Sequence, residues 1–123
     1  MILVDTSVWI DHLHHGDVAL TRLLNEGQVL THRLVVGELV LGSLLNRNIV
    51  LNSMRNLPQV TVATDDEVLQ FIESQALFGK GIGYVDSHFL AAVRLTPGVL
   101  LWTRDRRLSA ECARLGLCVD LTH

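Results

Sequence analysis

Two acidic residues stand where charged side chains are unusual in a folded domain. Asp5 follows the apolar run Ile2-Leu3-Val4, and Asp105 comes just after a second apolar run, at residues 99–103. Each run is typical of a buried parallel strand, so both carboxylates are expected at the carboxyl ends of strands, where open α/β sheets bind ligands. Considered alone, either acid could instead cap the helix that follows it.

Two further acids, Glu38 and Asp86, are expected on the apolar faces of helices. Each has apolar residues at helical spacings: Leu34, Leu41 and Leu45 for Glu38, and Phe89, Leu90 and Val93 for Asp86. An ionised carboxylate on a buried face is unfavourable unless it is paired with a cation or bound to a metal. A structural ion pair is the alternative for each acid alone, but Lys80 is the only lysine in the sequence, so ammonium partners are scarce.

Four carboxylates that meet at one edge of a sheet would repel one another. Two of them about 4 Å apart repel by roughly 4 kcal/mol at an effective dielectric constant near 20. Such a cluster must take up protons or hold a hard cation, and ligands that are all oxygen favour Mg²⁺ or Mn²⁺ over zinc. Because Mg²⁺ commonly links protein carboxylates to phosphate oxygens, the acids predict chemistry on phosphate esters.

Basic residues near these acids could contact phosphate. Three arginines surround Asp105: Arg104, Arg106 and Arg107. They could grip phosphate oxygens beside a metal or simply form a solvated helix start. The glycine-rich segment at residues 79–83 contains Lys80 but lacks the GxxxxGK[ST] pattern of a phosphate-binding loop. We expect this segment to be a flexible entry to the helix of Asp86, with a contact between Lys80 and phosphate as the alternative.

Short apolar strands alternate with helices along the chain, which is typical of the α/β class with a parallel sheet. The pattern predicts strands at residues 2–4, 28–31, 60–62, 99–103 and 117–119. Helices are expected at residues 8–13, 17–26, 33–45, 49–57, 64–77, 84–95 and 104–115. The sequence therefore predicts a central parallel sheet of four to five short strands flanked by helices, with the acids near one edge of it.

Composition limits the classes of protein that fit. A chain of 123 residues suits a single domain over residues 1–123, and its 49% hydrophobic content leaves apolar surface for a partner. No apolar run is long enough to span a membrane. The two cysteines form no CxxC pair, which indicates a reduced, cytoplasmic protein. The net charge of −3 argues against broad electrostatic binding of nucleic acid but allows a local basic patch.

Four segments in order along the chain resemble the motifs of PIN-domain proteins, and among these of the VapC toxins of prokaryotic toxin–antitoxin pairs. The segments are Ile2–Ser7, Val36–Leu39, Gly81–Ala91 and Leu101–Leu108. One acidic motif alone would be unspecific, whereas four in register over the whole chain are specific. The resemblance implies an endoribonuclease that depends on Mg²⁺ or Mn²⁺ and hydrolyses RNA phosphodiester bonds.

The resemblance also implies roles for individual residues and partners. Its four catalytic, metal-binding acids correspond to Asp5, Glu38, Asp86 and Asp105. Ser7 and Thr103 occupy positions of small hydroxyl residues that support these acids. The family further implies a homodimer and a cognate antitoxin of the VapB type, bound in a groove that the early helices line.

Two other functions do not fit the sequence. A signalling receiver domain needs a phospho-accepting Asp in mid-chain and a late Lys, but no acid lies between Glu38 and Asp65 and no lysine follows Lys80. A phosphatase with a DxD motif would need an Asp at position 7, where the chain has Ser7. The open alternative is a catalytically silent PIN-like module that binds RNA or protein. Incubation with RNA, with and without Mg²⁺, separates the two.

Overall fold

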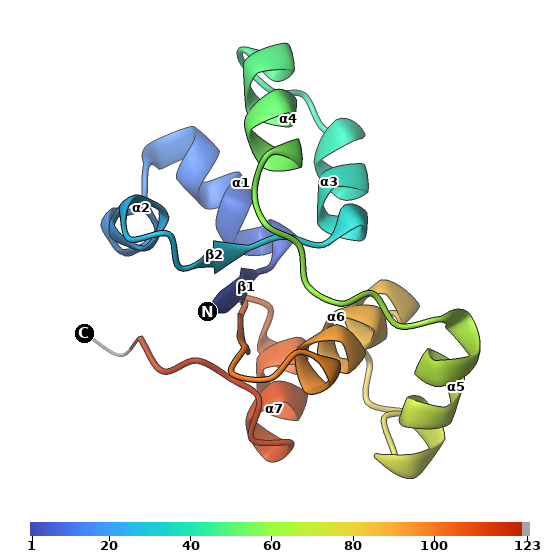
Figure 1. The fold of residues 1–123 in the computed structure, drawn as a ribbon. Helices are drawn as coiled ribbons and strands as arrows, with labels where there is room; N and C mark the ends of the chain where they lie inside the picture. The colour runs from blue at the N-terminus through green and yellow to red at the C-terminus, as the bar shows by residue number, and fades with distance from the viewer. Residues whose placement is uncertain (122–123) are drawn as a thin grey trace.

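In the computed structural model, which describes residues 1–121, three parallel strands form the sheet: β1 (Ile2–Val4), β2 (Val29–Leu30) and β3 (Leu100–Trp102). Their order is β2-β1-β3, and Leu3 of β1 is in register with both Leu30 and Leu101. Leu3 and Val4 are fully buried. The predicted central, buried strand at the start of the chain is therefore confirmed (Figure 1).

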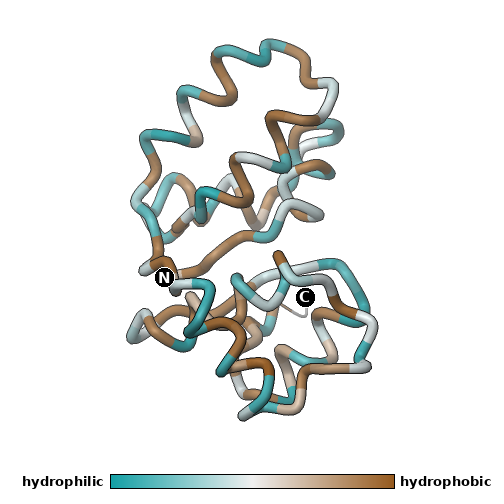
Figure 2. Tube along the Cα trace, turned by 90° about the vertical axis from the view of Figure 1, so that its right-hand side faces the viewer, coloured by the Kyte–Doolittle hydropathy of each residue, from teal (hydrophilic) through white to brown (hydrophobic). Residues whose placement is uncertain are grey.

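Helices lie on both sides of this sheet. They are α1 (Thr6–His15), α2 (Val18–Asn25), α3 (Arg33–Val40), α4 (Arg47–Arg55), α5 (Asp65–Ser74), α6 (Tyr84–Leu95) and α7 (Arg106–Arg114). Figure 1 shows α1, α3 and α4 together on one side of the strands, and α6 and α7 on the other. Teal and brown segments alternate along the helical turns in Figure 2, as expected of amphipathic helices packed on a common core.

The predicted sheet of four to five strands is wrong for the described part of the chain, which has three. Just before residues 60–62, Gln59 makes one isolated parallel bridge with Thr31. Within residues 117–119, Cys118 makes one isolated parallel bridge with Leu101. On the first edge Pro58 has no N–H to extend the pairing. The amide of Thr61 then donates to Thr96 Oγ1 at 3.1 Å, so the chain turns away from the sheet.

The predicted helix over residues 33–45 is also wrong at its end, because α3 stops at Val40. Gly42 follows, a residue that disfavours continued helix, and Asn46 adopts a left-handed φ of 54° before α4 begins. As a result Leu41 and Leu45, which were expected on a buried face with Glu38, are 88% and 89% exposed. Glu38 is exposed as well.

Periodicity and capping residues in the sequence predicted α6 and the start of α5 correctly. The predicted helix over residues 84–95 matches α6, and all residues from Ser87 to Val93 are buried. The Thr64 start is confirmed as a capping box, in which Thr64 and Glu67 exchange two hydrogen bonds, at 2.9 and 3.1 Å. Within residues 1–121 no helix is long and apolar enough to span a bilayer. The last two residues of the predicted 1–123 domain lie outside the described part.

Candidate active site

The four predicted acids come from four different elements and converge on one region. Asp5 directly follows β1, and Asp105 lies beyond β3 as the residue before α7, while Glu38 belongs to α3 and Asp86 to α6. The negative charges of Asp5, Asp105 and Glu38 all act on Asp86. The parallel sheet explains this convergence, because it places the carboxyl ends of β1 and β3 at the same edge.

Asp86 carries the electrostatic signature of this convergence. Burial raises the pKa of its carboxyl above the ordinary aspartate value, and the neighbouring carboxylates raise it further. A hydrogen bond of 3.2 Å from the Gly83 amide acts in the opposite direction but does not outweigh them. The negative charge of Asp86 is therefore less favourable here than in water, and a nearby cation would stabilise it.

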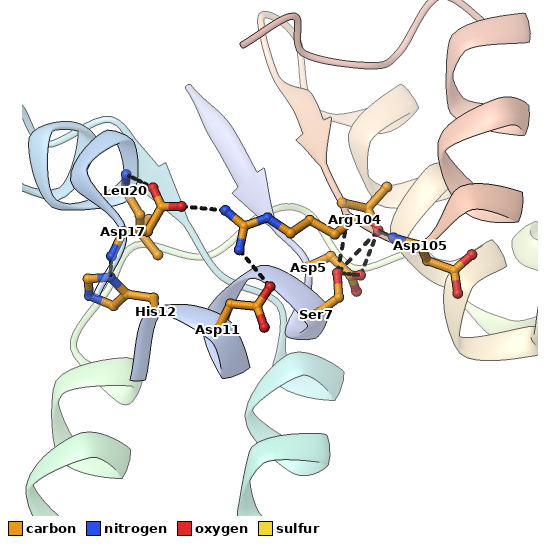
Figure 3. Close-up of polar contacts among 9 residues, drawn as sticks. Asp5, Ser7, Asp11, His12, Asp17, Leu20, Arg104 and Asp105 are labelled. Atoms are coloured by element: carbon orange, nitrogen blue, oxygen red, sulfur yellow. Dashed lines mark hydrogen bonds and ion pairs between the residues drawn. The ribbon is translucent and has the colours of Figure 1, made fainter. Parts of the chain in front are cut away.

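Asp5 is buried and is held by two hydroxyl groups. Ser7 Oγ and Thr103 Oγ1 each donate to Asp5 Oδ2 at 2.7 Å (Figure 3). Within the described residues the Asp5 side chain makes no capping hydrogen bond to α1, although it occupies the N-cap position. The geometry thus favours a site role over the alternative of a simple helix cap.

Glu38 and Asp105 are also fixed by neighbours, each through one oxygen. Thr6 Oγ1 donates to Glu38 Oε1 at 2.5 Å, a contact that sequence reasoning missed. The sequence feature that could have indicated this contact is Thr6 itself, a third hydroxyl residue, which directly follows Asp5 at the same edge of the sheet. The amide of Leu108 donates to Asp105 Oδ1 at 2.9 Å, so Asp105 does cap α7. In each of these two acids, the hydrogen bond uses only one of the two carboxylate oxygens.

A second polar group beside α6 was not recognised from the sequence. Tyr84 Oη donates to Asp65 Oδ1 at 2.8 Å, and His88 Nε2 lies 3.2 Å from the same oxygen. The hydrogen bonds from Tyr84 and His88 lower the pKa of Asp65. This group joins the start of α5 to the first turns of α6, and so it fixes the helix that carries Asp86.

The predicted basic residues are placed in different ways. Arg104 points away from the four predicted site acids. Its guanidinium instead pairs with Asp11 and Asp17 (Figure 3). Arg106, Arg107 and Lys80 are exposed. Arg107 lies across the glycine-rich segment, since a Cβ at Gly81 would be 2.8 Å from its Nη1 atom.

The donor set fits a hard divalent cation by its chemistry. All four acids offer oxygen ligands, and a cation would offset both the burial and the neighbouring negative charges that raise the pKa of Asp86. In the part of the chain that the structure describes, however, no three His, Cys, Asp or Glu side chains are arranged closely enough to hold a metal ion. Binding would therefore draw the carboxylates closer together than they lie here.

Comparison with known proteins gives two findings. The family model described as PIN domain matches residues 2–112. The chain is also 48% identical over 119 residues to a protein named Ribonuclease VapC32 from Mycobacterium tuberculosis, in strains CDC 1551 / Oshkosh and ATCC 25618 / H37Rv. The alignment covers 97% of this chain and 96% of that relative.

Proposed function

Because the chain belongs to the PIN-domain family, we propose that it is a toxin of the VapC type, an endoribonuclease that hydrolyses RNA phosphodiester bonds with the help of Mg²⁺ or Mn²⁺. The observation that carries this proposal is the convergence of four acids from β1, α3, α6 and the start of α7, close enough for the charges of the other three to act on Asp86. The ribonuclease name of the similar M. tuberculosis protein supports the same chemistry. The proposal treats residues 1–123 as one PIN domain.

In the proposed mechanism Asp5, Glu38, Asp86 and Asp105 would hold the cation. When bound, it supplies Lewis acidity toward a phosphoryl oxygen and lowers the pKa of the attacking water. The protein contributes fixed carboxylates. Hydroxyl groups orient Asp5 and Glu38, and the first turn of α7 orients Asp105. These contacts reduce the reorganisation that binding requires.

Basic side chains near the acids would bind the RNA. Arg106, Arg107 and Lys80 are exposed and stand close in sequence to Asp105 and Asp86. Their contacts with phosphate would supply affinity without reading sequence. Because the net charge is −3, such local cations matter more than the overall charge of the protein.

The proposal includes two protein partners. Leu41, Leu45 and Ile49 are 88%, 89% and 68% exposed, and these apolar side chains around the α3–α4 connection suit the binding of an antitoxin of the VapB type. A homodimer, which the resemblance to VapC toxins implies, would cover further apolar surface. We place the protein in the cytoplasm, where RNA and a co-expressed antitoxin are available.

The purified chain, incubated with total cellular RNA in Mg²⁺ or Mn²⁺ and in chelator, tests the function. We expect discrete fragments that need the metal and that disappear in the Asp5→Asn variant. Sequencing the 5′ ends of the fragments would identify the RNA and the cleavage site. If RNA is bound but stays intact under all metal conditions, the silent-module alternative replaces the nuclease.

A further inference from the structure

Arg104 is the residue between Thr103 and Asp105 in the loop after β3, and its side chain leaves the site. Its Nη1 atom lies 2.7 Å from Asp11 Oδ2 of α1, and its Nη2 atom pairs with Asp17 Oδ2, just before α2. The guanidinium carbon also lies 5.6 Å from the centre of the Trp102 ring. One side chain therefore connects the loop that carries Asp105 to the α1–α2 connection (Figure 3).

Asp17 is built into this connection from both sides. Its Oδ1 atom accepts from the Leu20 amide at 2.9 Å and caps α2, which leaves Oδ2 for Arg104. Its own amide donates to His12 Nδ1 at 3.0 Å. The Asp17 side chain is 16% exposed and the Arg104 side chain 37%, so water screens this ion pair only in part.

The backbone of the same loop shares hydrogen bonds with Asp5. The Arg104 amide donates to Ser7 Oγ at 3.0 Å, and the Asp105 amide donates to Thr103 Oγ1 at 3.1 Å. These two hydroxyl groups are the ones that donate to Asp5. A shift of residues 103–105 would therefore disturb Asp5 and Asp105 together.

We infer that Arg104 is a positioning residue, whose bridge to Asp11 and Asp17 fixes the 103–105 loop and thereby sets the distance between Asp5 and Asp105 for cation binding. This inference rests on the proposed function. It assigns Arg104 a different role from the exposed Arg106 and Arg107, because a guanidinium that is neutralised by two carboxylates has little charge left for phosphate. The fork geometry of arginine suits this bridge, since a lysine ammonium cannot present separate donors to two carboxylates in the same way.

Three measurements on Arg104→Ala test the inference, with Arg22→Ala as the matched control. Arg22 of α2 forms an exposed pair at 4.0 Å with Glu26, the residue after the helix, and this pair is separate from the Arg104 bridge. Mn²⁺ affinity of the RNA-free protein, measured by electron paramagnetic resonance of free Mn²⁺, should fall roughly tenfold or more, as for other residues that orient metal ligands. Hydrogen exchange in chelator should accelerate at the amides of residues 104 and 105. The salt dependence of binding to a short single-stranded RNA, measured in chelator, should not change.

Two further variants keep the test decisive if Arg104→Ala unfolds. Asp17→Asn retains a helix-capping oxygen but loses the charge, and should reproduce the loss of amide protection and of Mn²⁺ affinity. Arg104→Lys keeps the charge but not the bridge, so it should remain weak in Mn²⁺ binding. A phosphate contact would instead be preserved by lysine.

The outcomes distinguish this inference from the proposed function. Unchanged Mn²⁺ affinity and amide exchange, with a shallower salt dependence in Arg104→Ala, would overturn the positioning role and make Arg104 an RNA contact. If the wild type neither binds Mn²⁺ nor cleaves RNA, the proposed function fails. Amide exchange in chelator then still decides whether Arg104 holds the loop.

Discussion

At the scale of single residues, the four acids differ in how fully the protein satisfies them. Asp5 accepts two hydroxyl hydrogen bonds, Glu38 accepts one, and Asp105 accepts a backbone amide. Asp86 has the Gly83 amide at 3.2 Å, against burial and three neighbouring negative charges. It is therefore the acid whose charge the metal-free protein stabilises least.

Asp86→Asn should inactivate the protein and stabilise its metal-free fold. RNA cleavage in Mg²⁺ should fall more than about 100-fold, because a proposed ligand loses its charge. In chelator the thermal midpoint at pH 7 should rise, since the variant removes a carboxylate that repels its neighbours. A structural ion pair predicts the opposite, because the loss of one partner of a buried pair destabilises by roughly 3–5 kcal/mol.

The difference in stability between the wild type and Asp86→Asn should depend on pH. The folded-state pKa of Asp86 is raised, so the folded protein binds this proton more tightly than the unfolded chain does. Its ionisation destabilises the fold as pH rises from the ordinary aspartate value to the folded-state pKa, and the penalty is constant above that. The stabilisation in Asp86→Asn should therefore be full above the folded-state pKa, shrink as the pH falls below that pKa, and disappear below about pH 4. A gain that is independent of pH would point to a cause other than charge.

The exposed arginines beside Asp105 should affect RNA binding through charge alone. Replacing Arg106 and Arg107 with glutamine should weaken binding to single-stranded RNA. Because each lost phosphate contact lowers the slope of log K against log salt by roughly 0.7, the two together should reduce it by about 1 to 1.5. Fluorescence anisotropy in chelator over a range of salt measures this slope. An unchanged slope would leave both residues as a solvated helix start.

At the scale of elements, helix starts depend on a few local hydrogen bonds. α5 begins with the Thr64–Glu67 capping box, and α7 begins with Asp105. The second case matters for function, because one side chain serves both as a helix cap and as a proposed ligand. The Thr64–Glu67 capping box serves only the fold, so a substitution there allows stability to be separated from activity.

Thr64→Ala should destabilise the protein by about 1 kcal/mol, since the Glu67 amide loses its acceptor. RNA cleavage by the folded protein should stay close to wild type. Chemical denaturation measures the free energy of unfolding, and Thr61→Ala, an exposed threonine outside the helices, is the control. A large loss of cleavage without a loss of stability would mean that the start of α5 takes part in the reaction.

At the scale of the whole molecule, three of the four most exposed large apolar side chains in the described part of the chain come from one segment. Leu41, Leu45 and Ile49 lie close together in sequence around the α3–α4 connection. The acids, in contrast, come from both sides of the sheet at its carboxyl edge. Glu38 adjoins the α3–α4 connection, so the apolar positions to change are Leu45 and Ile49, which lie further along the chain.

Leu45→Glu and Ile49→Glu should weaken neutralisation by an antitoxin without abolishing RNA cleavage. Expression of the wild-type chain alone should arrest growth, and co-expression of an antitoxin encoded beside its gene should restore it. The two variants should arrest growth even with the antitoxin present. Leu69→Glu, at an exposed leucine of α5, is the control that should still be neutralised. A wild-type chain that leaves growth unaffected when expressed alone would contradict the toxin function.

The sequence alone determined the features that depend on neighbouring residues. An apolar run followed by Asp5 specified the central strand, and the Thr64–Glu67 pattern and the extent of α6 followed from capping and periodicity. The class of fold was also accessible, because strand-to-helix alternation is a local pattern. The apolar surroundings expected of Glu38 were wrong, since Glu38, Leu41 and Leu45 are exposed. The number of strands was not, since a strand needs a partner and the outer segments find only single bridges.

Tertiary structure decided which side chains meet. Thr6 reaches Glu38 across 32 positions, and Arg104 reaches Asp11 and Asp17 across 93 and 87. No local pattern records such contacts, because they arise when the parallel sheet brings the ends of β1, β2 and β3 together. Sequence could identify Arg104 only as a cation beside an acid. The fold decided that its charge is already balanced by Asp11 and Asp17, and that its place is in the support of the site.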